Sequence, residues 1–508
     1  MSATRAMRWS VLGLGLALLL HAACNGTSRV TPKQRHVLNR IGYGPDAWSL
    51  ARIQQLGSTE AYIEEQLHPE LLDDTALEAE IASLYPVQTM SWGVMRHTYH
   101  EYTGNPETGP YAPIRDSTRA KILRTVKSKR QLEQVLVDFW FNHFSVDANV
   151  DEARWGFVTL ERDAIRPNVF GSFETMLKAT AKNPGMLDYL DNMANFREGF
   201  VYQGTPSGIN ENYARELMEL HTIGVDGGYT QNDVREVARA FTGWTTIPPF
   251  SSLTTDGYRW LPLDGFQFLP EGHDMGAKSI MGALSLPANR GIVDGEDVIH
   301  FLATHPKTAE RISRKLCQRF VSESPPEPLV QATAAIFLAT NGDLRQVMRT
   351  ILLSPEFLGV TYANTKVKRP LVFAASLARV VGIRDDAIFA PEMDSRLQRM
   401  GEALYRAGPP TGYPESSRYW AGEGPFIGRI SLASQAALGN SGLMGVPPVA
   451  GSTPADIVEQ LRIQYLRSGP LEPGSRAALE ALAQSLPSSE RVRQTAATLF
   501  VTPNFLVH

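Results

Sequence analysis

The sequence predicts an all-α protein, one multi-helix globular domain with a small β-hairpin insertion around residues 258–269. Apolar residues recur three and four positions apart along most of the chain, which is the spacing of an amphipathic helix. Alternating apolar and polar residues, the pattern of a half-buried strand, are scarce. Glycine follows many of the apolar-periodic stretches, and glycine readily adopts the left-handed conformation at a helix end. The clearest of these stops are Gly42, Gly57, Gly171, Gly224, Gly243 and Gly342.

Length and composition limit the class of protein further. The chain has 508 residues, 43% apolar and 20% charged, which is typical of a folded globular protein with a sizeable core. The 49 Lys and Arg against 53 Asp and Glu leave a formal charge of -4, so no basic excess favours nucleic acid as a partner. Two cysteines exclude a disulfide-dense scaffold. One of them, Cys317, follows an apolar helical pattern, and we expect a buried free thiol.

The first 23 residues have the pattern of a secretory signal peptide. Arg5 and Arg8 precede an apolar run over residues 11–20, which is too short to span a bilayer as a permanent helix. Small residues followed by Cys24 resemble a bacterial lipoprotein cleavage box, although His21 stands where Leu is usual. We therefore predict an exported protein, anchored to the membrane through lipid on Cys24. Ordinary cleavage nearby, which would release a secreted protein, and a retained anchor are the alternatives.

Residues 24–508 are predicted to form a single large helical domain. Thr31 and Gln34 match a capping box, and Pro32 suits the first helical turn, so the first helix is expected to begin there. The predicted helices cover residues 32–40, 46–56, 59–67, 75–101 with an interruption at Pro86, 115–145, 152–166, 170–181, 185–190, 209–222, 231–242, 294–304, 306–320, 327–340, 343–353, 366–383, 393–406, 454–467, 473–485 and 488–500.

Two segments interrupt this helical pattern. In the insertion over residues 244–290, aromatic and apolar residues 258–263 and 266–269 flank an Asp-Gly pair, which predicts a hairpin turn. Insertions of this length are commonly lids or site loops. Residues 408–453 are rich in Gly, Pro and Ser, and we expect an irregular but ordered loop there because disordered linkers are poor in aromatic residues.

The densest polar segment is a predicted helical hairpin over residues 210–244. Glu211, Arg215 and Glu219 are spaced by four, so the arginine can pair with either acid, and Glu216 lies on the same polar side. His221 lies near the end of the first helix. Thr230 and Asp233 resemble a capping box at the start of the second helix. Such a hairpin is either a solvated pair of helices with weak salt bridges or the lining of a cleft whose groups perturb one another's pKa.

The same segment resembles the signature of the bacterial domain-of-unknown-function 1800 family. Residues 210–225 read Asn-Glu-Asn-Tyr-Ala-Arg-Glu-Leu-Met-Glu-Leu-His-Thr-Ile-Gly-Val, and further pieces agree in order at residues 38–45, 139–144 (Phe-Trp-Phe-Asn-His-Phe), 186–192, 273–278 and 353–357. Residues 401–413 resemble a late motif of the family, but with Glu402 for Gln and Tyr413 for Trp, which leaves the role of that motif open. The resemblance implies a largely helical, secreted or envelope protein. It also implies a partner, because members often lie beside genes for a sulfatase-like protein of unknown-function family 1501. It implies no reaction.

Polar groups inside these motifs are the candidates for chemistry. His143 ends a long apolar helix, and His273-Asp274 lies in the insertion. We hypothesise that His143, His273, Asp274 and the helix carrying residues 211–221 converge on one cleft. Carboxylates with imidazoles suit a divalent cation, whose identity the sequence does not give, or an acid/base pair with Arg215 holding an anionic group. The structural alternatives are a hydrogen-bonded core histidine, surface salt bridges and a turn-forming aspartate.

Two function classes follow from these patterns. The first is a hydrolase-like enzyme that acts on an extracellular or envelope polymer through a cleft of His, carboxylate and Arg. The second is a non-catalytic binding or assembly protein that works with the sulfatase-like partner. The sequence contains no nucleophile elbow, no His-Glu-x-x-His, no phosphate loop and no Cys-x-x-Cys. A basic stretch over residues 115–130 is interpreted as a solvated helix face, with phosphate binding as the alternative.

Overall fold

The computed structural model describes residues 30–100, 108–202, 204–246, 265–449, 453–467 and 469–508. The predicted signal peptide (1–23), the predicted acylation site Cys24 and the first strand of the predicted hairpin (258–263) lie outside the described residues.

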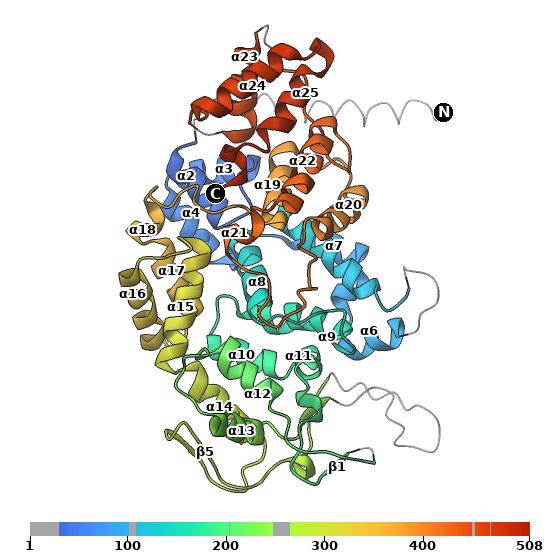
Figure 1. The fold of residues 1–508 in the computed structure, drawn as a ribbon, viewed down its shortest axis with the longest axis vertical. Coiled ribbons are helices and arrows are strands. Elements are labelled where there is room, and N and C mark those ends of the chain that lie inside the picture. The colour runs from blue at the N-terminus through green and yellow to red at the C-terminus, as the bar shows by residue number, and fades with distance from the viewer. Residues whose placement is uncertain (1–29, 101–107, 203, 247–264, 450–452, 468) are drawn as a thin grey trace, which may run out of the picture.

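The prediction of an all-α architecture is confirmed, because helices dominate the chain and the strands are few and short. The capping boxes predicted at Thr31 and Thr230 are both present. Figure 1 shows an elongated arrangement in which α8 lies near the centre, the C-terminal helices gather at one end and the short strand pairs at the other. The helices of the N-terminal half are α2 (Pro32–Arg40), α3 (Ala47–Leu56), α4 (Thr59–Gln66), α5 (Thr75–Leu84), α6 (Trp92–Tyr99), α7 (Ala112–Lys127), α8 (Gln131–His143), α9 (Ala153–Thr159), α10 (Phe173–Ala181), α11 (Pro184–Tyr189), α12 (Asn212–Glu216) and α13 (Gln231–Ala240).

The C-terminal half continues the helical pattern, and none of the described helices is long and apolar enough to cross a bilayer. Its helices are α14 (Val293–Ala303), α15 (Pro306–Phe320), α16 (Glu327–Ala339), α17 (Leu344–Leu352), α18 (Pro355–Leu358), α19 (Pro370–Val381), α20 (Asp386–Arg399), α21 (Ser417–Trp420), α22 (Glu423–Leu438), α23 (Pro454–Leu461), α24 (Pro473–Ser485), α25 (Ser488–Leu499) and α26 (Pro503–Leu506).

The single helix predicted over residues 115–145 is wrong, because α7 and α8 are separate. Ser128 has extended backbone angles, φ -60° and ψ 138°, which end α7. The carboxylate of Asp74 accepts hydrogen bonds from the Ser128 hydroxyl and from the Lys129 amide, at 2.5 and 3.0 Å. The break is therefore held by a side chain more than fifty positions away in sequence, which local periodicity cannot reveal.

The irregular loop predicted over residues 408–453 is also wrong in part, because it contains α21 and the 16-residue helix α22. Pro425 lies in the first turn of α22, where proline removes no intrahelical hydrogen bond. Gly428 costs helix stability but allows close packing, since a Cβ there would lie 2.3 Å from Met400. The helix ends at Gly439, whose φ is 76°. The high content of Gly, Pro and Ser therefore hid the helix α22, in which Gly428 is needed for close packing against Met400.

Helix α20 begins earlier than predicted. The pattern placed a helix over residues 393–406, whereas α20 begins after Asp385, whose carboxylate accepts from the amides of Ala387 and Ile388. The helix continues through Pro391 and ends at Arg399.

The strands form three antiparallel pairs, all two-stranded. These are β1 (Val201–Tyr202) with β2 (Thr205–Pro206), β3 (Trp244–Thr246) with β4 (Phe266–Phe268), and β5 (Lys278–Ile280) with β6 (Leu284–Leu286). The predicted strand at 266–269 exists as β4, but the partner that the structure shows for it is β3, with Trp244 opposite Phe268. Since β3 follows α13 directly, this pairing joins the described end of the insertion to the residues after α13.

Helices α9 and α11 cross at two glycines. A Cβ placed on Gly156 would lie 2.2 Å from the backbone nitrogen of Gly185, and one on Gly185 would lie 2.8 Å from the carbonyl carbon of Gly156. The two backbones therefore touch without intervening side chains, and the contact fixes α11 against α9.

Candidate functional site

The structure brings together two of the predicted site residues, His143 and His221. Both side chains are buried, with 3% and 1% exposure, and their ring centroids lie 6.1 Å apart. His143 Nε2 lies 3.1 Å from the backbone carbonyl oxygen of His221. A carbonyl only accepts, so Nε2 carries the proton and Nδ1 is the acceptor. Nδ1 receives a hydrogen bond of 2.9 Å from the Lys315 ammonium, a residue that the sequence analysis did not single out.

His221 reaches this position through a turn that periodicity did not predict. The regular helix expected over residues 209–222 is wrong in its second half, because α12 continues into a π-helical turn over Leu217–His221. The Thr222 hydroxyl donates to the Leu217 carbonyl, and the amide of Gly224 donates to the Met218 carbonyl. Residues just after the π-helical turn thus satisfy the carbonyl groups of Leu217 and Met218 and stabilise the turn. Single π-helical turns of this kind occur frequently at functional sites.

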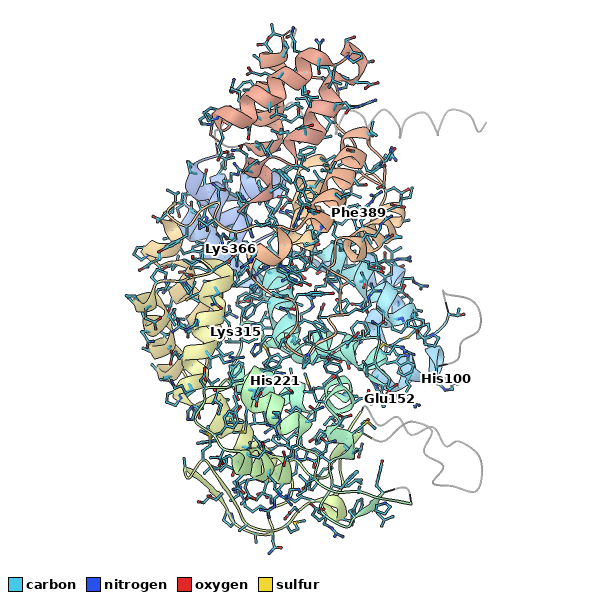
Figure 2. The ribbon with its side chains drawn as sticks, viewed as in Figure 1. His100, Glu152, His221, Lys315, Lys366 and Phe389 are labelled. Carbon is cyan, nitrogen blue, oxygen red and sulfur yellow. The ribbon has the colours of Figure 1, made fainter. Side chains whose placement is uncertain are left out.

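Helix α15 supplies two cations to the same cluster, Arg311 and Lys315, which lie one turn apart on one face. The Arg311 guanidinium donates to the carbonyl of Leu220 at 3.2 Å. It passes over Gly224, where a Cβ would lie 3.2 Å from Nη1. Figure 2 shows Lys315 and His221 near the centre of the molecule, where α15 faces the end of the π-helical turn. We call Arg311, Lys315, His143 and His221 the α15 cluster.

The electrostatics of the α15 cluster are set by burial and by like charges. Burial, Lys315 and Arg311 lower the pKa of His221 to about 3. Burial and then Lys315 hold the pKa of His143 well below its usual range, so both imidazoles are neutral near pH 7. Burial and Arg311 lower the pKa of Lys315 to about 8. Among the residues that the structure describes, neither Lys315 nor Arg311 forms an ion pair with a carboxylate.

The predicted carboxylates do not enter this cluster. Arg215 lies 3.2 Å from Glu211 and 3.7 Å from Glu219, and its side chain is 37% exposed. Burial and the neighbouring Glu219 raise the pKa of Glu216, and its side chain remains partly exposed. The arrangement is the salt-bridged helix surface that was the structural alternative for this segment.

His273 and Asp274 belong to a different, structural network. His273 is fully buried, and its Nδ1 lies 2.7 Å from the backbone carbonyl of Thr242. The buried carboxylate of Asp294 lies 3.4 Å from His273 Nε2 and 2.7 Å from the Lys278 ammonium. Asp274 accepts two hydrogen bonds from Arg239, at 2.8 and 3.1 Å. These bonds hold the insertion against α13.

The single-cleft hypothesis therefore lacks support in the contacts. Within the described ranges, no hydrogen bond or ion pair joins His273 or Asp274 to His143, His221 or Glu211. The described residues also contain no group of three or more His, Cys, Asp and Glu that could hold a metal ion. Cys317 is buried and free, as predicted, and burial raises the pKa of its thiol to about 12.

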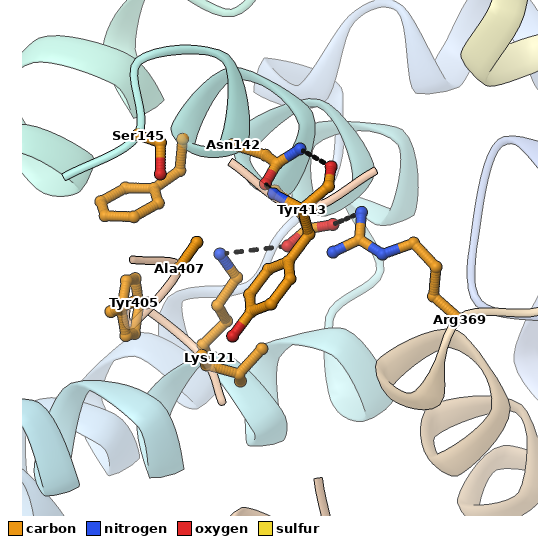
Figure 3. A pocket seen from close by; sticks show the side chains of 10 residues that line it. Lys121, Asn142, Ser145, Arg369, Tyr405, Ala407 and Tyr413 are labelled. Atoms are coloured by element: carbon orange, nitrogen blue, oxygen red, sulfur yellow. Dashed lines mark hydrogen bonds and ion pairs between the residues drawn. The ribbon is translucent and has the colours of Figure 1, made fainter. Parts of the chain in front are cut away.

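A second polar cluster, which the sequence analysis missed, surrounds Asp138 in the middle of α8. Its carboxylate lies 3.3 Å from the Lys121 ammonium and 3.4 Å from the Arg369 guanidinium (Figure 3). Glu161 lies 3.2 Å from Lys121 and accepts from the Tyr405 hydroxyl at 2.8 Å. The basic stretch interpreted as solvated is thus partly wrong, because Lys121 is buried and paired. A lone Asp inside an apolar helix was the sequence signal for this cluster.

Small cavities lie on either side of the Asp138 cluster. The one in Figure 3 encloses about 20 Å³, which is room for about one water molecule. The other encloses about 150 Å³ beside Arg124, Glu161 and Tyr405. Tyr405 has a left-handed backbone, with φ 63°, which is unusual for an aromatic residue and is held here by its buried hydroxyl contact.

The late motif packs directly against the Phe-Trp-Phe-Asn-His-Phe motif. The Asn142 side chain donates to the Tyr413 carbonyl at 2.8 Å and accepts from the Tyr413 amide at 2.7 Å. Gly412, with φ 70°, passes so close that a Cβ there would lie 2.3 Å from the Asn142 carbonyl. Glu402 accepts from the Arg369 guanidinium, at 2.9 Å for Nε, and from the Leu371 amide at 2.8 Å. The motif that departs from the family pattern is therefore part of the Asp138 cluster.

The fold and these clusters define a predominantly helical protein with two buried polar centres, one around Asp138 in the middle of α8 and one around His143 at its end. The chain matches the family described as "Protein of unknown function (DUF1800)" over residues 36–507, nearly its whole length, and it belongs to that family. The family resemblance inferred from the motifs is thus confirmed. Searches of curated proteins and of solved structures give no match to the chain.

Proposed function

We propose that this protein is an exported, non-catalytic binding or assembly protein of the cell envelope, and that its partner is a sulfatase-like protein of unknown-function family 1501. The observation that carries the proposal is an apolar face on α22 that projects into solvent. Phe426, Ile427, Ile430 and Leu438 are 40%, 66%, 42% and 52% exposed. Monomeric proteins rarely expose clustered large apolar side chains unless the surface binds something.

These four residues lie on one side of the helix. Their spacing of one, three and eight positions places them within about a third of the circumference of α22. The opposite side of α22 carries Leu432, Ala433 and Ala436, which are fully buried. The exposed residues are therefore not needed to hold the helix in place. We call them the α22 apolar face.

The state of the predicted site residues also supports binding over catalysis. Glu211 and Asp274 are engaged by Arg215 and Arg239, and His273 is fully buried among structural contacts. A cleft in which histidines and carboxylates converge would have favoured an enzyme.

Envelope location follows from the predicted signal peptide and from Cys24. A mature protein that begins at an acylated Cys24 is the expected result of mass spectrometry on the exported chain. Recovery of the chain with residues 1–23 intact would contradict it.

Removal of the α22 apolar face is expected to weaken the complex. The test is titration of the purified family 1501 protein from the same organism into the mature chain. Ile427→Ser with Ile430→Ser is expected to reduce affinity about tenfold or more, because each isoleucine loses more than about 1 kcal/mol of apolar burial. The matched control is Leu71→Ser with Leu338→Ser, two apolar residues of 69% and 41% exposure elsewhere, which is expected to leave affinity unchanged. Absence of a complex with the unaltered chain, or equal losses in both variants, would reject the proposal.

A hydrolase-like enzyme acting on an extracellular or envelope polymer is the second candidate, and one observation favours it. The Lys315 ammonium contacts His143 Nδ1 at 2.9 Å, and burial and Arg311 lower its pKa to about 8, so part of the side chain is neutral at that pH and can act as a general base. Release of soluble fragments from peptidoglycan or from acetylated polysaccharide by the unaltered chain, but not by Lys315→Met, would favour this candidate over the first.

A further inference from the structure

Helix α15 carries five cations, and the structure separates them into two kinds. Lys307, Arg314 and Arg319 each have a carboxylate partner, at 3.6, 2.8 and 3.4 Å from Glu310, Glu327 and Glu415. The other two, Arg311 and Lys315, have none among the described residues and are partly withdrawn from solvent.

Leaving two neighbouring cations unpaired and partly buried is costly, because each loses hydration and repels the other. No acid among the described residues pairs with either cation to relieve this cost. It places two neutral imidazoles and the backbone carbonyl of Leu220 beside them instead. The acid whose charge raises the pKa of Lys315 is Glu415, whose ion pairs go to Arg319, Lys366 and Arg369.

A second, independent feature is that two buried nitrogen atoms of the α15 cluster lack a hydrogen-bond partner in the described part of the chain. Nε2 of His221 is buried and has no hydrogen-bond partner among the described residues, and the same holds for Nε of Arg311. Buried polar atoms are almost always paired, so the imidazole nitrogen of His221 and the two cations without carboxylate partners within the described ranges are groups available to a ligand.

We infer that Arg311 and Lys315, with His221 beside them, form a binding site for an oxyanion, namely a sulfate, phosphate or carboxylate group. Guanidinium and ammonium groups in a partly desolvated setting make charge-assisted hydrogen bonds to such oxygens, roughly twice as strong as neutral ones. His143 positions Lys315 through the 2.9 Å contact and does not itself face the anion in this arrangement. The inference goes beyond the α22 proposal and does not depend on it.

Binding of an anion must raise the pKa of Lys315, because an opposite charge favours the ammonium form. Without a bound anion, Lys315 loses that proton as the pH passes about 8. The other groups around Lys315 keep their charge between pH 7 and 9. His143 and His221 stay neutral and Arg311 stays cationic. Arg319, Lys366 and Arg369 hold the pKa of Glu415 well below its usual range against the effect of burial, and the two arginines remain charged when Lys366, whose pKa is lowered to about 8, loses its proton. Affinity for an anion of constant charge is therefore expected to fall as the pH rises from 7 to 9.

The experiment is calorimetric titration of the mature chain with sodium sulfate, whose charge does not change in this pH range, at constant ionic strength. Parallel titrations with inorganic phosphate and with acetate distinguish a tetrahedral anion from a carboxylate as the preferred group. Saturable binding of at least one anion is expected. Arg311→Gln or Lys315→Met is expected to weaken it about tenfold or more, since each removes a charge-assisted hydrogen bond.

Two further variants make the result specific. Arg314→Gln removes a cation of the same helix that is already paired with Glu327, and it is expected to change affinity by less than about twofold. Lys315→Arg keeps the charge but cannot lose its proton, so binding persists and its fall between pH 7 and 9 disappears. Near-ultraviolet circular dichroism and the melting midpoint establish that each variant is folded. No saturable binding of any of the three anions, or equal losses in Arg311→Gln and Arg314→Gln, would overturn the inference.

Discussion

Replacement of Arg369 by methionine is expected to lower the free energy of unfolding by about 3–5 kcal/mol. The guanidinium is buried and contacts Asp138 and Glu402, which are themselves buried. Its removal leaves the buried Glu402 without an ion-pair partner among the described residues and takes one cation from Asp138, which keeps Lys121. An uncompensated buried charge costs far more than the intact ion pair contributes. Urea denaturation followed by tryptophan fluorescence measures the change.

The control for this prediction is Arg349→Met, which breaks a pair with Glu64 on the surface. Its side chain is 53% exposed, so a loss below about 1 kcal/mol is expected. The double variant Arg369→Met with Glu402→Met is expected to recover part of the lost free energy of unfolding, because it also removes the carboxylate that Arg369 neutralises. Equal, small losses in Arg369→Met and Arg349→Met would show that the Asp138 cluster is well hydrated.

Alanine at Gly156 is expected to destabilise the protein by about 3 kcal/mol, at the upper end of the usual cost of overpacking. The new Cβ would lie 2.2 Å from the backbone nitrogen of Gly185, and backbone cannot rotate away as a flexible side chain can. Helices α9 and α11 would have to separate. The melting midpoint and urea denaturation report the loss.

Gly93→Ala on α6 is the matched control, because a Cβ there meets nothing within 4 Å. Alanine has the higher helix propensity, so this variant is expected to be unchanged or stabilised by up to about 1 kcal/mol. Losses of similar size at both positions would contradict the account of a backbone contact between α9 and α11.

The helical architecture was predictable because its determinants are local. Capping residues such as Thr31 and Thr230 act within three positions of themselves, and both capping boxes are present. The errors occur where a distant residue decides the outcome. Asp74 separates α7 from α8, and Met400 takes up the space that Gly428 leaves on α22.

The candidate site was predictable only in part, for the same physical reason. His143 and His221 stood out because they lie in specific motifs, and the structure places them together. Lys315 and Arg311 look like ordinary surface cations of an amphipathic helix. Their importance depends on which groups lie opposite them, and no acid in the described part of the chain pairs with them. No spacing in the sequence records this.

The two hydrogen bonds between Asn142 and Tyr413 are expected to slow hydrogen exchange in the segment after Glu402. That segment has little regular secondary structure, so its amides would ordinarily exchange with solvent deuterium within seconds. Here the Tyr413 amide donates to the side chain of Asn142, which lies on α8. Glu402 and Glu415, which flank Tyr413 in the sequence, both form ion pairs with Arg369. Its deuterium uptake should therefore follow that of the central helices, and the segment should open only when the interior around α8 unfolds.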